Sequence, residues 1–318
     1  MTISSFLKLV EIQTKVASMI PFFLGTAYTL YRFESFNFKN FSIMFISLLC
    51  VDMGTTAINN YVDYRKAIKK HGYNYETHNA IVKYNLKESI VIATIGVLFL
   101  AAIVFGVLLY LNTNFIILLL GIVSFIASVL YSYGPIPISR LPLGEIFSGI
   151  FMGFIIVFIS IYIHVFDKNI IFYSYSNEVL NLGINVKEII YIFLLCVPPI
   201  VGIGNIMLAN NICDMEDDIE NKRYTLPIFI GKEKALKLFK ALYCIAYLDI
   251  ILLLILRIVP SITAISLLTL ILVNKNIKRF AHLQTKKDTF ILAVKNFVLL
   301  NIVQVITIGI GAVIKNIS

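Results

Sequence analysis

The chain has 318 residues, of which 59% are hydrophobic and only 14% are charged. Its mean hydropathy of +0.88 is too high for a soluble domain, whose surface needs many more charged side chains. The composition therefore excludes a soluble globular protein and predicts a polytopic membrane protein. The four cysteines and four histidines are scattered without ligand or disulfide spacing, so we expect neither a zinc site nor a disulfide framework.

Nine apolar stretches are long enough, or nearly so, to cross a bilayer as helices. In chain order they are residues 15–31, 41–60, 89–111, 115–131, 143–165, 188–210, 235–256, 259–273 and 290–313. Pro198 and Pro199 are expected to kink the sixth helix. No cleavable signal is expected, because no small-residue cleavage site follows the first apolar stretch. The prediction is an all-α bundle of about nine transmembrane helices with two related halves, forming a single domain over residues 1–318.

Basic residues are unevenly distributed between the two sides of this predicted bundle. The N-terminus and the loops after the second, fourth, sixth and eighth helices hold most of the 27 lysines and arginines. The positive-inside rule therefore places this side in the cytoplasm, with the helices in the cell membrane. The net charge of +9 follows from this topology and favours anionic lipid, so nucleic-acid binding is not expected. On the other side, the long loop 167–187 is expected to form an interfacial hairpin or a surface helix.

An acidic cluster closes the sixth predicted helix. Asn210, Asp214 and Asp218 fall four residues apart, so a helix would stack them along one face. Gathered carboxylates repel one another unless a cation lies between them, and an oxygen-lined site with room for water and phosphate oxygens suits Mg²⁺. Asn59 and Asp63 repeat this spacing at the end of the second predicted helix. A single aspartate there would usually serve only interfacial solvation, but the repetition favours two half-sites that face one ligand.

Basic residues follow each acidic cluster closely. The first cluster runs into Arg65 and Lys66, and the second runs into Lys222 and Arg223. Acids followed by bases are typical of a site for a metal-bound polyanion, in which phosphate oxygens complete the metal shell and the bases neutralise the remaining charge. The sequence contains no glycine-rich nucleotide-binding loop. A diphosphate on a lipid tail fits better, because its head would lie at the interface and its tail among the helices.

These motifs resemble those of the UbiA superfamily of intramembrane aromatic prenyltransferases. The resemblance rests on Asn59-x-x-x-Asp63, on the longer motif at 210–218, and on the Lys-Arg-x-Thr-Leu segment at 222–226. It rests also on Tyr-Ser-Tyr-Gly-Pro-Ile-Pro at 131–137, followed by Pro-Leu-Gly-Glu at 142–145. Within the superfamily, the chain is most similar to the 1,4-dihydroxy-2-naphthoate polyprenyltransferases of menaquinone biosynthesis. These share the Asn-Asn start of the second motif and the Tyr-x-x-Gly-Pro-x-Pro segment.

The resemblance implies Mg²⁺-dependent transfer of an allylic prenyl group from a polyprenyl diphosphate to an aromatic acceptor. In the naphthoate enzymes, this transfer is accompanied by loss of the ring carboxylate. The metal ligands that it implies are Asn59, Asp63, Asp214 and Asp218, and the three aspartates are the expected catalytic residues. The residues expected to bind substrate are Asn59, Arg65, Lys66, Tyr131, Arg140, Asn210, Asn211, Lys222 and Arg223.

The first motif departs from the family pattern. Asn60 stands where Asp or Glu is common, and Ala67 and Lys69 stand where a further acid is common. Asp63 is then the only acid of the first half-site. We therefore expect the first half-site to hold metal less strongly than the second, unless Glu76 substitutes.

Three alternatives remain open from the sequence. A cation-coupled transporter also holds acids within a helical bundle, but these usually lie near mid-membrane, where only Asp52 and Asp249 come close. The missing acids of the first motif suggest a non-catalytic homologue that only binds isoprenoid lipid. Thr14-Lys15 replaces an Arg-Pro pair common near the first helix, which suggests a transferase for another aromatic or lipid acceptor. Neither prenyl chain length nor oligomeric state follows from the sequence.

Overall fold

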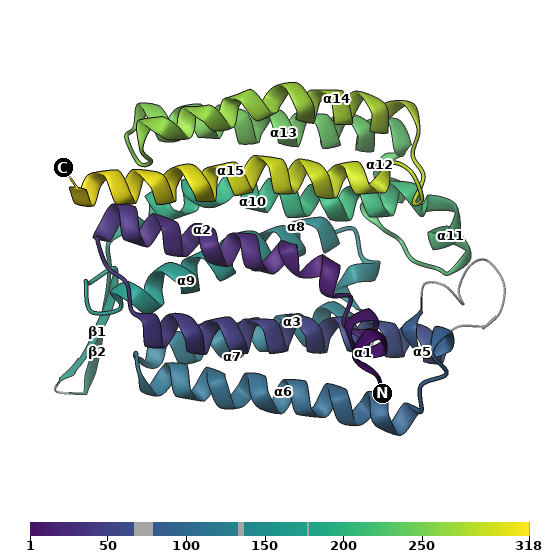
Figure 1. The fold of residues 1–318 in the computed structure, drawn as a ribbon, viewed down its shortest axis with the longest axis horizontal. Helices are drawn as coiled ribbons and strands as arrows, with labels where there is room; N and C mark the ends of the chain where they lie inside the picture. Colours follow the sequence, from purple (N-terminus) through teal and green to yellow (C-terminus); the bar gives the residue numbers. More distant parts are fainter. Residues whose placement is uncertain (67–78, 133–136, 177, 318) are drawn as a thin grey trace. The chain divides into compact units, whose positions relative to one another are not determined.

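A computed structural model describes residues 1–66, 79–132, 137–176 and 178–317, most of them in helices (Figure 1). The chain divides into two compact units, Met1–Ser18 with Ser42–Ile138 and Met19–Phe41 with Ser139–Ser318. The boundaries fall within α2 (Val16–Phe33), α3 (Phe38–Lys66) and the short helix η2 (Ile138–Arg140).

The first unit is built around α3 and a pair of long apolar helices. α6 (Glu88–Leu111) and α7 (Phe115–Ser132) are joined by a short turn and pack against each other (Figure 1). The shorter elements of this unit are α1 (Ile3–Leu9), η1 (Ile12–Lys15) and α5 (Ala80–Lys83). They cover the C-terminal part of α3 through a buried cluster of Leu9, Ala57, Ala80, Ile81 and Val91.

The second unit is organised around α10 (Val186–Cys213), which packs against the π-helix η3 (Gly149–Ile155) and against α13 (Lys232–Ile255) and α15 (Phe290–Ile317). A Cβ atom on Gly153 would lie 2.5 Å from the backbone nitrogen of Ile200. Only glycine therefore allows η3 to approach α10 this closely. The remaining helices are α8 (Gly144–Ser148), α9 (Ile156–Val165), α11 (Met215–Glu220), α12 (Leu226–Ile230), η4 (Ser261–Leu268) and α14 (Thr269–His282).

Each of the nine predicted apolar stretches corresponds to a helix or a continuous run of helices. Within the described part of the chain, six are long and apolar enough to cross a membrane, and a shorter apolar helix covers Phe115–Tyr131. The six are Phe38–Arg65, Glu88–Leu111, Gly144–Val165, Val186–Cys213, Lys232–Ile255 and Phe290–Ile317. α2 has 18 residues and carries Arg32 in its last turn, while α14 ends in a basic segment. Length and composition therefore establish a multi-helical membrane architecture but not a count of nine spans.

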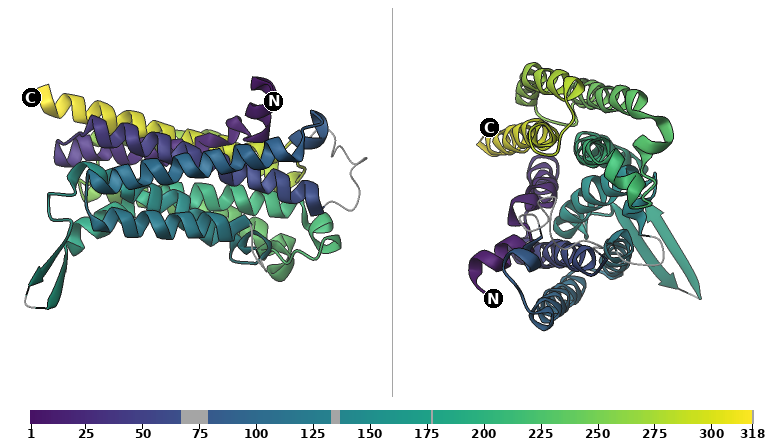
Figure 2. Two further views of the ribbon diagram at one scale, coloured as in Figure 1. Left: turned by 90° about the horizontal axis from the view of Figure 1, so that it is seen from below. Right: turned by 90° about the vertical axis from the view of Figure 1, so that its right-hand side faces the viewer.

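The loop 167–187 forms a β-hairpin, which confirms one of its two predicted forms and makes the other, a surface helix, wrong. β1 (Ile171–Ser176) pairs antiparallel with β2 (Val179–Ile184). Figure 2 shows the hairpin extending beyond the ends of the neighbouring helices α9 and α10. The Tyr162 hydroxyl donates to the Ile171 carbonyl at 3.1 Å and ties the hairpin to α9.

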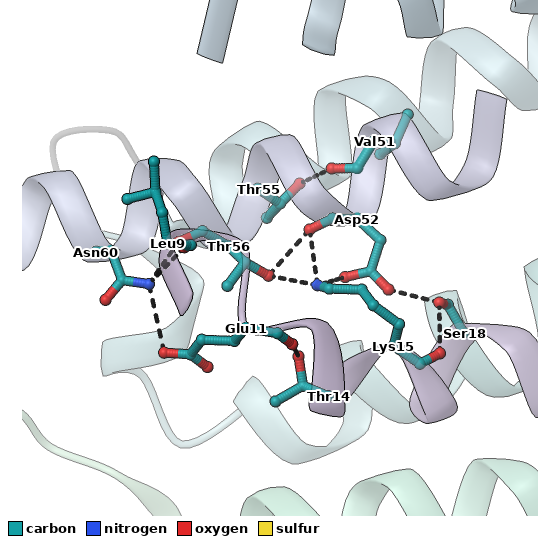
Figure 3. Close-up of polar contacts among 10 residues, drawn as sticks. All are labelled: Leu9, Glu11, Thr14, Lys15, Ser18, Val51, Asp52, Thr55, Thr56 and Asn60. Carbon is teal, nitrogen blue, oxygen red and sulfur yellow. Dashed lines mark hydrogen bonds and ion pairs between the residues drawn. The ribbon is translucent and has the colours of Figure 1, made fainter. Parts of the chain in front are cut away.

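A buried ion pair joins η1 to α3 within the first unit (Figure 3). Lys15 Nζ lies 2.6 Å from Asp52 Oδ1 and donates to Thr56 Oγ1 at 2.7 Å. Ser18 Oγ donates to the other carboxylate oxygen at 2.5 Å. Because Lys15 is only 4% exposed, the two charges compensate each other away from water. Asp52, the acid near the middle of the second predicted span, is thus paired with Lys15. In a cation pathway, this carboxylate would have to be available to the transported ion.

Replacing Lys15 with Met is expected to destabilise the protein, because Asp52 would remain as an unpaired buried charge. Removing one partner of a buried ion pair costs about 3–5 kcal/mol. Chemical unfolding in detergent micelles measures this change. The double variant Lys15→Met/Asp52→Leu removes both charges and should recover most of the lost stability. A single variant as stable as the wild type would show that the pair makes no net contribution.

Candidate functional site

The acidic segment of the second unit spans the junction between α10 and α11. Asp214 ends α10 and precedes α11, with φ −102° and ψ 9°. Helical hydrogen bonding nevertheless continues through the junction, since Asp214 N donates to the Asn210 carbonyl at 3.1 Å and Asp218 N donates to the Asp214 carbonyl at 2.7 Å. The backbone therefore keeps Asn210, Asp214 and Asp218 in the predicted four-residue register.

A lysine from a distant loop lies between the oxygens of Asn210 and Asp214. Lys286 Nζ donates to Asn210 Oδ1 at 2.8 Å and forms an ion pair with Asp214 Oδ2. Asn210 Nδ2 donates to the same carboxylate oxygen at 3.3 Å. Lys286 was not among the residues expected from the sequence, because positive-inside topology alone accounts for a lysine in this loop. The structure adds it to the second half-site.

Asp218 contacts the segment that follows α11. Thr225 Oγ1 donates to Asp218 Oδ2 at 3.2 Å, and Arg223 Nε lies 3.5 Å from Oδ1. Burial raises the pKa of the Asp218 carboxyl and Asp214 adds to the rise, while Arg223 and the Thr225 hydroxyl oppose it. A further cation beside this carboxylate would favour its ionised form. Of the two predicted bases of this segment, Arg223 is half-buried beside Asp218, whereas Lys222 is exposed.

Asn211 joins the end of α10 to α8. Its Nδ2 donates to Glu145 Oε1 at 2.8 Å, and both side chains are buried. Nearby, the Tyr224 backbone nitrogen donates to the Arg140 carbonyl at 3.1 Å. These bonds hold the Pro-Leu-Gly-Glu segment against the acidic segment. Glu145 was not selected from the sequence, although an acid at the start of an otherwise apolar helix was a usable signal.

The first acidic cluster lies near the C-terminal end of α3, in the first unit. Asn59 is half-buried and Asp63 is exposed. Arg65 Nη1 lies 3.3 Å from Glu88 Oε2 at the start of α6. The remaining predicted residues near this cluster are Lys66, the last residue of α3, and Tyr131, which is half-buried in α7. Ala67, Lys69 and Glu76 lie outside the described residues.

Asn60, which stands where the family commonly has an acid, has a structural role. Its Nδ2 donates to the Leu9 carbonyl at 2.9 Å and to Glu11 Oε1 at 3.3 Å (Figure 3). The backbone carbonyl of Asn60 accepts a hydrogen bond from Asn79 Nδ2 at 2.9 Å. An aspartate here would place a carboxylate against two acceptor oxygens in a site that is 8% exposed. The contacts therefore account for an amide at this position.

The donor atoms at the end of α10 are of a kind that suits Mg²⁺. In the described part of the chain, no three His, Cys, Asp or Glu side chains come together as a metal-binding group. Instead, Asp214 is paired with Lys286 and Asp218 with Arg223. An amide oxygen and a carboxylate oxygen that jointly hold an ammonium group are hard ligands. They fit part of a Mg²⁺ shell that water and phosphate oxygens would complete.

The chain is similar to known prenyltransferases in both sequence and fold. A model described as "UbiA prenyltransferase family" matches residues 18–301. The chain is 30% identical over 238 residues to 1,4-dihydroxy-2-naphthoate octaprenyltransferase of Bacillus subtilis (strain 168), covering 75% of this chain and 70% of that protein.

Solved structures of UbiA homologues have a similar fold. The apo homologue from Aeropyrum pernix K1 has a TM-score of 0.67 and 18% identity, covering 96% of this chain and 98% of that one. The homologue from Archaeoglobus fulgidus bound to GPP and Mg²⁺ has a TM-score of 0.68 and 13% identity, covering 97% and 99%. The family match and the Bacillus relative indicate an enzyme, so the transporter and the non-catalytic alternatives are set aside. By sequence and by fold, the chain belongs to the UbiA prenyltransferase family and is a prenyltransferase.

Proposed function

We propose that this enzyme transfers a prenyl group from a polyprenyl diphosphate to 1,4-dihydroxy-2-naphthoate in menaquinone biosynthesis. One observation carries the diphosphate chemistry. At the end of α10, oxygens of Asn210 and Asp214 together hold a positively charged group, the ammonium of Lys286. The acceptor rests on the Bacillus relative, which is named for a naphthoate substrate, and on the Asn-Asn start of the second motif.

The proposed division of labour follows the charges of the site. Asp214 and Asp218 would hold Mg²⁺, which stabilises negative charge on a leaving diphosphate, and the family resemblance gives Asn59 and Asp63 the same role as metal ligands. The bases Arg65, Lys66, Lys222 and Arg223 would neutralise the remaining phosphate charge. As the allylic C–O bond breaks, the electron-rich acceptor ring attacks the carbon. Tyr131, Arg140, Asn210 and Asn211 would complete the substrate-binding set.

Residue placement within the second unit supports this assignment. Asn211 and Glu145 fasten the end of α10 to α8, so the acidic segment is held on a rigid element. Thr225 and Arg223 orient the Asp218 carboxylate. Such support matters because catalytic electrostatics depends on donors and charges fixed in advance of the reaction.

The enzyme is proposed to act as a single domain in the cell membrane. The N-terminus and the loops that carry both acidic clusters would face the cytoplasm. The lipid-borne diphosphate would enter from the bilayer, with its tail among the helices. Membrane lipid is then the natural surrounding of both substrate and product.

The acceptor is tested with purified protein, Mg²⁺, a labelled polyprenyl diphosphate and a panel of aromatic acceptors. We expect a prenylated naphthalenediol that lacks the ring carboxylate, identified by its mass. Chelation of divalent metal should abolish its formation. A product formed only with a hydroxybenzoate or another ring would contradict the naphthoate assignment and favour a different acceptor.

Asp214→Asn and Asp218→Asn should each lower the rate and raise the Mg²⁺ concentration needed for half-maximal activity. Loss of one charge-assisted contact of about 1.5–3 kcal/mol corresponds to roughly 10- to 100-fold. The matched control is Asp217→Asn, which removes an exposed acid from the same segment and should leave the Mg²⁺ requirement unchanged. If all three variants behave alike, the segment contributes only general negative charge.

The orientation is tested by labelling single cysteines in a background free of the four native ones. A cysteine at Lys232, before α13, should react with an impermeant reagent only after the membrane is opened. A cysteine at Tyr175, on the exposed β-hairpin, should react in intact cells. The reverse pattern would overturn the proposed topology.

A further inference from the structure

The loop between α14 and α15 presents Lys286 from a hydrogen-bonded turn. Thr289 N and Phe290 N donate to the Thr285 carbonyl at 3.1 and 3.0 Å, and Thr285 N donates to Thr289 Oγ1 at 2.9 Å. The backbone on both sides of Lys286 is therefore fixed. Its side chain, in contrast, is 49% exposed and has room to change its partner.

The contact that Lys286 makes is specific to the acidic segment. It crosses 72 residues of sequence to Asp214 and bonds Asn210 at the same time. The adjacent Lys287 is also exposed, yet the described residues include no ion-pair partner for it. General attraction between a basic loop and an acidic segment would not distinguish these two lysines. The ammonium group of Lys286 occupies a defined place between two oxygens.

That place conflicts with a bound divalent cation. The proposed function assigns Asp214 to Mg²⁺, and two cations sharing one carboxylate oxygen would repel each other. When the metal enters, the ammonium group must therefore move away from Asp214. A diphosphate whose oxygens complete the metal shell would then offer the ammonium group a new anionic partner. Lysine binds phosphate well in such a role, as a compact charge on a flexible stem.

We propose that Lys286 is a further diphosphate-binding residue, which pairs with Asp214 before the metal binds and moves to the phosphate oxygens when Mg²⁺ takes its place. This inference rests on the proposed function for the identity of the metal and of the anion. It adds a binding residue from the loop before the last helix. It also predicts that metal and Lys286 compete for the same oxygens.

The test compares Lys286→Met with the matched control Lys287→Met, both in the full-length protein. Mn²⁺ serves as a spectroscopic substitute for Mg²⁺, and its binding is followed by electron paramagnetic resonance without substrate. Lys286→Met should bind Mn²⁺ about two- to fivefold more tightly, because a competing ion pair of modest strength is lost. Lys287→Met should bind it as the wild type does.

The second measurement is binding of a non-reactive farnesyl thiolodiphosphate at saturating Mn²⁺, followed by calorimetry. Lys286→Met should weaken this binding by about tenfold or more, because a charge-assisted contact is missing. Lys286→Arg keeps the charge and should restore most of the affinity. Matching gel-filtration profiles and unfolding midpoints establish that the variants are folded.

Each outcome bears directly on the inference. Unchanged Mn²⁺ and analogue affinities in Lys286→Met would reduce Lys286 to a surface lysine. Tighter Mn²⁺ binding with unchanged analogue binding would limit it to occluding the site and overturn its phosphate role. Neither measurement uses an aromatic acceptor. A wild-type protein that binds neither Mn²⁺ nor the analogue would contradict the proposed function itself.

Discussion

The close packing of α10 is the constraint on which the second unit depends. Gly153 allows the π-helix η3 to lie against the backbone at Ile200, and a side chain at this position would force the two helices apart. The same approach carries α8 to the end of α10, where Glu145 accepts from Asn211. π-helical turns are often found at functional sites, where they redirect a few side chains without breaking the helix. Here the π-helix η3 lies between the apolar helix α9 and the short helix α8, whose Glu145 contacts the end of α10.

Ion pairs join helices within each of the two units. Lys15 is matched by Asp52 in the first unit, and Arg32 by Glu188 at 2.6 Å in the second. Removing either member of such a pair would leave an uncompensated charge in a low-dielectric setting. This pairing is typical of a fixed scaffold. The ion pair between Lys286 and Asp214 differs from these two pairs. Lys286 is half-exposed, and the proposed reaction requires the Asp214 carboxylate as a metal ligand.

The two half-sites differ in the groups that they offer. The second half-site supplies Asp214 and Asp218 from one backbone segment. Asp214 is paired with Lys286, and Asp218 is paired with Arg223. The first supplies Asp63, while Asn60 is engaged by Leu9 and Glu11. An acid at Asn60 would disturb the packing of the N-terminal segment on α3. The first half-site is therefore proposed to contribute more through its bases than through its acids.

The sequence determined the features that depend on local composition. Long apolar runs place the helices, since a segment in lipid must satisfy its backbone internally, and four-residue spacing identifies the acidic segment without any tertiary information. Only the tertiary structure decided which of these groups have partners. Lys286 is distant in sequence from Asp214, and Glu145 is separated from Asn211 by two helices and a hairpin, so no periodicity connects them. The hairpin form of residues 171–184 and the structural role of Asn60 likewise depend on contacts between segments. Hydrogen bonds and ion pairs are made between atoms in space, and spacing along the chain predicts them only within a single helix.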